Sequence, residues 1–350
     1  MNMKNIFRNK RILITGGCGT VGSELVHQLL AFSPAEVLVL DNDETGIFFM
    51  NERYRDRDQV HAFLGDVRDE DKLGKCMMKV HIVFHTAAFK HVSVCEYNPF
   101  DAVQTNILGV QNVIQSAINQ GVEKVIFTSS DKAVNPTNVM GTSKLMGERL
   151  ITSANNLKMS DKTIFASTRF GNVVGSKGSV IPVFYNQIKK GGPVTLTDLR
   201  MTRFIMTVQE ATRLVLKTSV IARGGEVAIT KMPVLMIKDL AEVMIDILSK
   251  RFGLKKKVQI KTIGSKPGEK LYEELMTQEE AVRSMELGDI FITLPAFRSF
   301  YAKIRYTYPE KTKKVTRPYI SAQEKFMTKK EIHDFLIHNH VLNFCEGFLE

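Results

Sequence analysis

The sequence contains no long apolar run and few cysteines. No stretch of about 18 apolar residues is present, so we expect no membrane span. The first residues, MNMKNIFRNKRILITGG, lack an apolar region before a cleavage site, which argues against a secretory signal. The cysteines (Cys18, Cys76, Cys95 and Cys345) lie far apart, without a C-x-x-C pair or clustered histidines. This spacing indicates free thiols in a reducing cytoplasm and no metal site.

The positive charge is concentrated in one stretch of the chain. The formal net charge is +11, and residues 250–270 contain eight lysines and arginines against one glutamate. A basic surface of this kind can face phosphates, lipid or nucleic acid. Aromatic residues for base stacking are scarce in it, however, so a solvated face is favoured and no nucleic-acid partner is expected.

Short apolar runs rich in β-branched residues alternate with longer amphipathic stretches. The runs are RILIT (11–15), EVLVLD (36–41), VHAFLG (60–65), HIVFHTAA (81–88), KVIFTSS (124–130) and TIFASTRF (163–170). Within 101–121, the residues Val103, Ile107, Val110 and Val113 have helical spacing, which predicts one helix ending at Gly121. Continuous apolar strands alternating with helices predict an α/β fold with a doubly wound parallel sheet of the Rossmann type.

The pattern becomes looser after about residue 172. GSKGSVIP, KKGGPVTLTD and SKPGEKLYEE place glycine and proline between short elements. We therefore predict a sheet-containing domain over 1–171, to which later segments contribute, and a smaller interwoven substrate lobe over 172–300. A C-terminal tail over 301–350 follows, with an amphipathic helix at KKEIHDFLIHNHVL.

A glycine-rich turn follows the first predicted strand. Gly17, Gly19 and Gly22 have G-x-G-x-x-G spacing directly before a predicted helix, and such glycines let a pyrophosphate approach the backbone at a helix N-terminus. The second strand ends at Asp41, about 20 residues further on, where a carboxylate binds the adenosine ribose and repels a 2′-phosphate. The sequence therefore predicts NAD rather than NADP as the cofactor.

Two further strand ends are assigned to the same cofactor. Asp66 and Val67 close the third strand, where a carboxylate can bond adenine, and Ala87 and Ala88 close the fourth, where small side chains leave room. The predicted cofactor residues are Gly16, Gly17, Gly19, Thr20, Val21, Gly22, Asp41, Asp66, Val67, Ala87 and Ala88.

The fifth strand ends in TSSDK. This places Ser130, Asp131 and Lys132 consecutively at the carboxyl edge of the sheet, where doubly wound folds bind ligands. A helix bearing Lys144 follows at once, with Met140 one turn before it. Because the cofactor motif predicts a site at the same edge, these residues are the candidates for chemistry.

Several stretches together carry a family resemblance. They are TGGCGTVGSEL, AAFKHVSVCEYNPFDAVQTNILGVQNV, SSDKAVNPTNVMGTSKLMGE, RFGNVVGSKGSVIPVF, TDLRMTRFIM and KPGEKLYEEL, between about residues 11 and 285. The chain resembles the extended short-chain dehydrogenase/reductase superfamily and, within it, bacterial nucleotide-sugar 4,6-dehydratases of the polysaccharide-biosynthesis type. The resemblance implies a cytoplasmic UDP-N-acetylglucosamine 4,6-dehydratase that pairs as a homo-oligomer through segments near 99–120 and 138–156.

The resemblance also implies a reaction. C4 of the sugar would be oxidised by NAD⁺, water eliminated across C5 and C6, and hydride returned to C6. Asp131 would be the acid and Lys132 the base of the elimination, while Ser130 would bond the C4 hydroxyl. Lys132 stands where relatives acting on plain hexoses have a glutamate, which points to an N-acetylhexosamine.

The family's proton-accepting tyrosine is replaced by Met140. Three explanations are open. In the first, Lys144, neutralised by burial and also contacting the cofactor, accepts the C4 hydroxyl proton directly or through water, as in a sub-branch with N-x-M-G-x-S-K. In the second, another group such as Tyr97 accepts it, and in the third the oxidation is lost and the protein only binds its ligand. Met140 itself suits core packing on a helix face.

Residues for the nucleotide sugar are also implied by the resemblance. Asn172 and Arg203 would contact the diphosphate, or in the case of Asn172 the uracil, Glu269 would contact the ribose, and Lys90 would line the site. The sequence leaves open UDP against GDP and retention against inversion at C5. It also leaves open a 4-epimerase, a 5,6-dehydratase and a redox-inactive module that binds NAD or sugar nucleotide.

Overall fold

The computed structural model describes residues 3–157, 163–176, 179–265, 267–308 and 310–344. The chain forms two compact units built from alternating segments. Unit 1 comprises Met1–Phe170, Ala211–Lys231 and Met276–Pro318, and unit 2 comprises Gly171–Glu210, Met232–Leu275 and Tyr319–Glu350. Residues 211–231 and 276–300 thus group with unit 1. The sequence prediction had drawn the substrate lobe over 172–300 while expecting later segments to contribute to the first domain.

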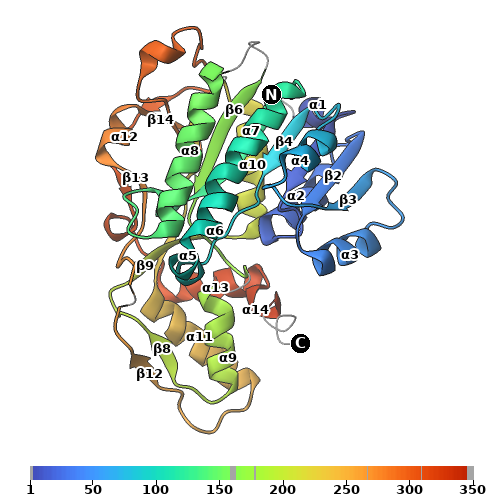
Figure 1. Cartoon of the computed structure of the whole chain (residues 1–350). Coiled ribbons are helices and arrows are strands. Elements are labelled where there is room, and N and C mark those ends of the chain that lie inside the picture. The colour runs from blue at the N-terminus through green and yellow to red at the C-terminus, as the bar shows by residue number, and fades with distance from the viewer. Residues whose placement is uncertain (1–2, 158–162, 177–178, 266, 309, 345–350) are drawn as a thin grey trace. The chain divides into compact units, whose positions relative to one another are not determined.

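Unit 1 is built on one large sheet with a parallel centre. The parallel strands follow the order β3-β2-β1-β4-β5-β6-β10, so the strand order reverses between β1 and β4. They are β1 (Arg11–Thr15), β2 (Glu36–Asp41), β3 (Val60–Leu64), β4 (Ile82–His85), β5 (Lys124–Ser130), β6 (Ile164–Phe170) and β10 (Val227–Thr230). This confirms the predicted doubly wound parallel sheet (Figure 1).

Three antiparallel strands extend the sheet beyond β10. They are β15 (Ile290–Thr293), β14 (Ser284–Leu287) and β16 (Lys313–Lys314), in that order. Because β10 and β15 are paired in register over four residues, the segments that carry them belong with the first sheet although they come late in the sequence.

Helices cover the faces of this sheet. In Figure 1, α4, α7 and α8 lie in front of it, and their apolar side chains share one core with β1, β2, β4, β5 and β6. The helices of unit 1 include α1 (Met3–Phe7), α2 (Thr20–Leu30), α3 (Glu44–Arg53), α4 (Glu70–Cys76), α5 (Val92–Tyr97), α6 (Pro99–Val103), η1 (Gln104–Leu108), α7 (Gly109–Asn119), η2 (Asp131–Ala133), α8 (Val139–Leu157), α12 (Gln278–Val282) and η3 (Arg298–Tyr301). Most of α10 (Val208–Ile221) also belongs to unit 1, which resumes at Ala211.

The stretch 101–121 departs from the single regular helix that was predicted. It consists of the end of α6, the π-helical turn η1 and α7. A π turn contains one extra residue per turn, so it rotates the residues before it away from the stripe that follows. Val110 and Val113 are accordingly buried, whereas Val103 is 41% exposed.

Unit 2 has its own core of helices and short strands. Its helices are α9 (Val180–Lys189), α11 (Ile237–Arg251), η4 (Ser321–Gln323), α13 (Lys329–His338) and α14 (Val341–Phe344). Its strands include β7 (Asn172–Val173), β8 (Val194–Leu196), β9 (Thr202–Met206), β11 (Val234–Met236), β12 (Ile260–Thr262) and β17 (Tyr319–Ile320), while β13 (Glu274–Met276) straddles the boundary. Side chains from α9, α11 and α13 pack together in one apolar cluster.

In the part of the chain that the structure describes, no helix is both long and apolar enough to cross a membrane.

Candidate active site

The glycine turn is packed so closely that side chains do not fit in it. Gly16 has φ +70°, and a Cβ there would lie 2.5 Å from the backbone nitrogen of Ala87. A Cβ on Gly22 would lie 2.3 Å from the carbonyl oxygen of Gly16. The turn therefore brings the end of β4 against the loop after β1 and leaves Gly19 as the residue that caps α2. Backbone N–H groups at such a helix start suit a phosphate.

Asp41 is joined to the same turn. Its carboxylate accepts hydrogen bonds from the backbone N–H of Cys18 (2.9 Å) and of Asp43 (3.1 Å). The first bond ties the end of β2 to the loop between β1 and α2. The structure thus brings Asp41 together with the predicted glycines.

Asp66 lies at the end of the third strand and is held by its neighbours. Its carboxylate accepts hydrogen bonds from Asn42 Nδ2 (3.1 Å), the Arg68 N–H (2.9 Å) and Arg68 Nη2 (2.7 Å). Burial opposes ionisation, but these bonds outweigh it and lower the pKa of the Asp66 carboxyl. Val67, beside it, is 5% exposed and packs in the core below α4 and α7.

Ser130, Asp131 and Lys132 form a connected group where β5 enters η2. Ser130 Oγ donates to Asp131 Oδ1 at 2.7 Å, and Lys132 Nζ donates to the same oxygen at 3.0 Å. Asp131 is fully buried, and its Oδ2 has no hydrogen-bond partner among the described residues. One oxygen of this buried carboxylate is thus hydrogen-bonded, and the other keeps an unused capacity to accept or share a proton.

Lys144 is buried on α8 and directed toward β5. It is 6% exposed, its Nζ donates to the carbonyl of Thr128 at 3.0 Å, and it lies 4.7 Å from the centroid of the Phe127 ring. Burial lowers the pKa of Lys144 to about 8, which makes the neutral amine accessible near neutral pH.

Met140 is part of a small apolar cluster. It is 3% exposed and packs with the buried Cys95 and Ala102, next to Phe89 and Val92. The helix position that could carry a phenol is therefore filled by core packing. Tyr97, the alternative proton acceptor, is 88% exposed, so its position does not favour that role.

In unit 2, Arg203 and Glu269 form an ion pair. Arg203 is 7% exposed, and its guanidinium lies 3.7 Å from Glu269 and 3.5 Å from Glu273. It also donates to the carbonyls of Thr202 (2.8 Å) and Lys270 (2.9 Å). Most N–H groups of the Arg203 guanidinium thus already have a hydrogen-bond or ion-pair partner within unit 2.

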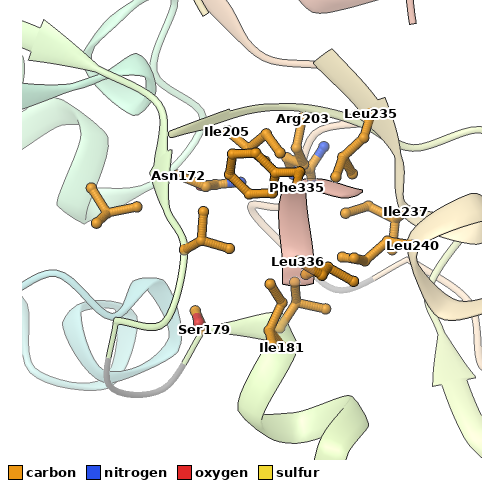
Figure 2. A pocket seen from close by; sticks show the side chains of 13 residues that line it. Asn172, Ser179, Ile181, Arg203, Ile205, Leu235, Ile237, Leu240, Phe335 and Leu336 are labelled. Carbon is orange, nitrogen blue, oxygen red and sulfur yellow. The ribbon is translucent and has the colours of Figure 1, made fainter. Parts of the chain in front are cut away.

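Asn172 and Arg203 line a mostly apolar pocket within unit 2 (Figure 2). Ile205 of β9 and Phe335 and Leu336 of α13 lie around the same pocket. The contribution of α13 was not foreseen, because a helix 130 residues or more beyond Arg203 gives no local signal of this contact. The remaining predicted substrate residue, Lys90, is exposed in unit 1.

Unit 1 also contains a buried ion triad that was not predicted from the sequence. Arg169 of β6 bonds to both Glu148 of α8 and Glu280 of α12. The spacing of Lys144 and Glu148, one helical turn, was a usable sign that the glutamate lies on the same face. Nothing in the sequence connects Arg169 to Glu280, 111 residues away.

His85 is a further buried polar residue that the sequence did not single out. Its Nδ1 lies 2.7 Å from Thr15 Oγ1, and burial lowers the pKa of its imidazole to about 3, so the ring stays neutral. Within the described residues, no group of three or more histidine, cysteine or acidic side chains could hold a metal ion.

The chain is similar to known proteins over most of its length. The family model described as polysaccharide biosynthesis protein matches residues 12–295. The chain belongs to this family. A crystal structure of Pen from Bacillus thuringiensis has 45% sequence identity and a TM-score of 0.88, and the match covers 96% of this chain and 99% of Pen.

Curated relatives of the chain carry different names. An uncharacterized membrane protein of Methanocaldococcus jannaschii is 51% identical over 84% of this chain and 88% of its own. A UDP-N-acetylglucosamine 4,6-dehydratase (inverting) of Campylobacter jejuni is 35% identical over 98% and 100%. A UDP-glucose 4-epimerase of Rickettsia canadensis is also 35% identical, over 99% and 99%. The chain spans about half the length, 46%, of a capsular polysaccharide protein of Staphylococcus aureus.

Proposed function

We propose that this protein is a nucleotide-sugar 4,6-dehydratase that uses NAD and acts on UDP-N-acetylglucosamine. The observation that carries the proposal is the buried Asp131 carboxylate, bonded to Lys132 Nζ at 3.0 Å at the carboxyl end of β5. An elimination needs an acid and a base on neighbouring positions, and this group supplies both. The dehydratase name of the Campylobacter jejuni relative, aligned over 98% of this chain, supports the same reaction.

The residues around the glycine turn fit NAD. Side chains are excluded at Gly16 and Gly22, so a pyrophosphate could approach the backbone there, and Asp41 is in place for a ribose hydroxyl. A carboxylate at that position disfavours the 2′-phosphate of NADP. NAD would supply reversible hydride transfer at C4 and C6 of the sugar.

The protein's own groups would handle the protons. Lys144 would accept the proton of the C4 hydroxyl, and Ser130 would hydrogen-bond that oxygen. The new ketone makes the C5 proton acidic, so Lys132 would remove it while Asp131 protonates the departing C6 hydroxyl. In unit 2, Asn172, Arg203 and Glu269 are proposed to hold the nucleotide.

A 4-epimerase is the second candidate, because the Rickettsia canadensis relative with that name covers 99% of this chain. Epimerisation requires oxidation and reduction at C4 but no elimination. It therefore has no use for an acid–base group at Asp131 and Lys132. The two reactions give products of different mass.

The decisive experiment incubates the purified protein in D₂O with UDP-N-acetylglucosamine and, separately, with its GDP counterpart. Mass spectrometry and NMR follow the sugar, and acid-released nucleotide identifies NAD or NADP. Loss of one water, a new 6-methyl group and deuterium at C5 would support the dehydratase. An isomer of unchanged mass would support the epimerase, and an unchanged sugar with bound ligand would support a binding module.

We also propose that the protein assembles into a homo-oligomer through α5, α6, η1 and α8. These elements contact one another and expose large apolar side chains, namely Val94, Tyr97, Phe100, Val103, Leu108 and Met146. Tyr97 is 88% and Phe100 81% exposed, which is costly for a monomer in water.

Charges within this apolar surface should dissociate the oligomer. We expect the wild type to sediment as a dimer or larger species and the double variant Y97D/F100D to sediment as a monomer, in light scattering coupled to gel filtration. V282D is the matched control, because Val282 of α12 is 70% exposed and lies outside the surface. A wild-type monomer, or an unchanged double variant, would contradict the proposal.

A further inference from the structure

The buried triad of Glu148, Arg169 and Glu280 carries charge into the interior of unit 1. Arg169 is 1% exposed; its Nε and Nη2 donate to Glu148 at 2.9 and 2.6 Å, and its Nη1 and Nη2 donate to Glu280 at 2.9 and 3.0 Å. Glu148 is 3% and Glu280 5% exposed. A second guanidinium, that of Arg283, lies 3.7 Å from Glu280, so Glu280 is paired with two cations, whereas the ion pair of Glu148 among the described residues is with Arg169.

Lys144 is a buried cationic group on the same helix as Glu148. It precedes Glu148 by four residues on α8, so the two side chains share one helix face. No salt bridge to Lys144 is found among the described residues, and its Nζ contacts only the Thr128 carbonyl and the Phe127 ring. A buried ammonium held by neutral groups depends strongly on charges one turn away, because the interior screens them weakly.

The triad also adjoins the strand end that bears the predicted acid and base. Arg169 is paired with Ser129 across β5 and β6, one residue before Ser130. The capping box of α12 fixes Glu280, whose carboxylate accepts the backbone N–H of Thr277 at 3.1 Å. The triad is therefore anchored by α8, β6 and α12.

We propose that this triad, acting through Glu148, is the positioning element that sets the protonation of Lys144. The proposal rests on the function proposed above, in which Lys144 replaces the missing phenol as the proton acceptor. Burial alone would hold Lys144 neutral, whereas the carboxylate favours the ammonium form, and an amine that exchanges its proton near neutral pH needs both influences. Consistently, burial lowers the pKa of Lys144 to about 8, while the charge of Glu148 acts in the opposite direction.

Arg169 has a defined part in this balance. By bonding both oxygens of Glu148, it weakens the pull of that carboxylate on the Lys144 proton. Glu280 in turn weakens the effect of Arg169. Other ionisable groups on α8, on the elements packed against it, on β4 and beside the triad include Arg149 of α8, Cys95, Glu96 and Tyr97 of α5, Asp101 of α6, Lys124 of β5, Asp131 and Lys132 of η2, Tyr301 of η3, His85 of β4, and Arg283, which pairs with Glu280.

The test measures the titration of Lys144 itself. ¹³C NMR of protein with labelled lysines follows the Cε resonance against pH, with K144R providing the assignment. We expect E148Q to lower the Lys144 pKa by about 0.5–1 unit, because it removes the charge that favours the ammonium. E280Q should shift it in the same direction by less, and E148D should stay close to the wild type. The acid limb of the pH–rate profile should move in parallel.

E286Q is the matched control, because Glu286 pairs with Lys231 at 2.7 Å on the half-exposed β14 and should leave the titration unchanged. An unchanged Lys144 titration in E148Q and E280Q would overturn the proposal. If E148Q does not fold, E280Q alone decides: a lowered Lys144 pKa supports the proposal, and an unchanged or raised pKa contradicts it. The NMR readout needs no turnover, so a protein that converts no sugar would refute the proposed function and leave this test intact.

Discussion

Replacing Asp131 by asparagine is expected to lower the rate of dehydration by about 10³-fold. The amide keeps the size of the side chain, and its oxygen can still accept from Ser130 and Lys132 as the carboxylate does. It has no proton to give to the departing C6 hydroxyl. Oxidation at C4 does not need that proton, so reduced nicotinamide should accumulate on the enzyme and be visible in its absorbance spectrum.

A comparison with Lys132→Met separates the two roles. D131N should still exchange the C5 hydrogen for deuterium in D₂O, because the base is present, whereas K132M should not. D289N is the control for the chemical change, since Asp289 pairs with Lys217 and its side chain is 70% exposed. If D131N retains more than about a tenth of the wild-type rate, the acid lies elsewhere and the assignment is wrong.

Lys144→Met is expected to stop the reaction at its first step, with a loss of about 10³-fold or more. The methionine fills a similar volume but cannot accept the C4 hydroxyl proton. In this variant, neither product nor reduced nicotinamide should form, which distinguishes it from D131N. In the wild type the rate of C4 oxidation should rise with pH through about 8, because the pKa of Lys144 is lowered to about 8 and the neutral amine prevails above it.

Lys124 offers a matched control for Lys144. It is another largely enclosed lysine, its Nζ donates to the carbonyl of Ser219 at 2.6 Å, and burial likewise lowers its pKa. It lies at the opposite end of β5, where no predicted site residue is found. K124M should therefore keep its turnover with a comparable loss of stability. A K144M enzyme that still oxidises C4 would show that another group takes the proton.

The sequence alone predicted the central sheet well. Each apolar run from 11–15 to 163–170 became a parallel strand. All but β3 are largely buried, and a strand covered on both faces is continuously apolar and can be recognised locally, whereas β3 lies at the edge of the sheet with exposed side chains. The glycine turn was equally readable, since the absence of side chains at Gly16 and Gly22 is itself the feature that the packing requires. Asp131 and Lys132 could be predicted to lie together because they are consecutive residues directly after one strand, β5.

Other features depended on contacts that no local pattern records. The π turn after α6 moves Val103 away from the buried helix face that its spacing predicted. The segments of the two units alternate along the chain because β10 pairs with β6 and β15. Arg203 was predicted as a phosphate contact, but only the structure shows that Glu269, Glu273 and backbone carbonyls already hold it.

By itself, the sequence determined which segments form the parallel strands, where the glycine turn for the cofactor lies, and which reactive residues end β5. Each of these features depends on neighbours within a few positions along the chain. The tertiary structure decided the environment of those residues: the burial of Asp131 and Lys144, the apolar packing of Met140, and the Glu148–Arg169–Glu280 triad. Burial and long-range charge come from side chains up to 111 residues apart, and these set proton affinity, which a linear pattern does not contain.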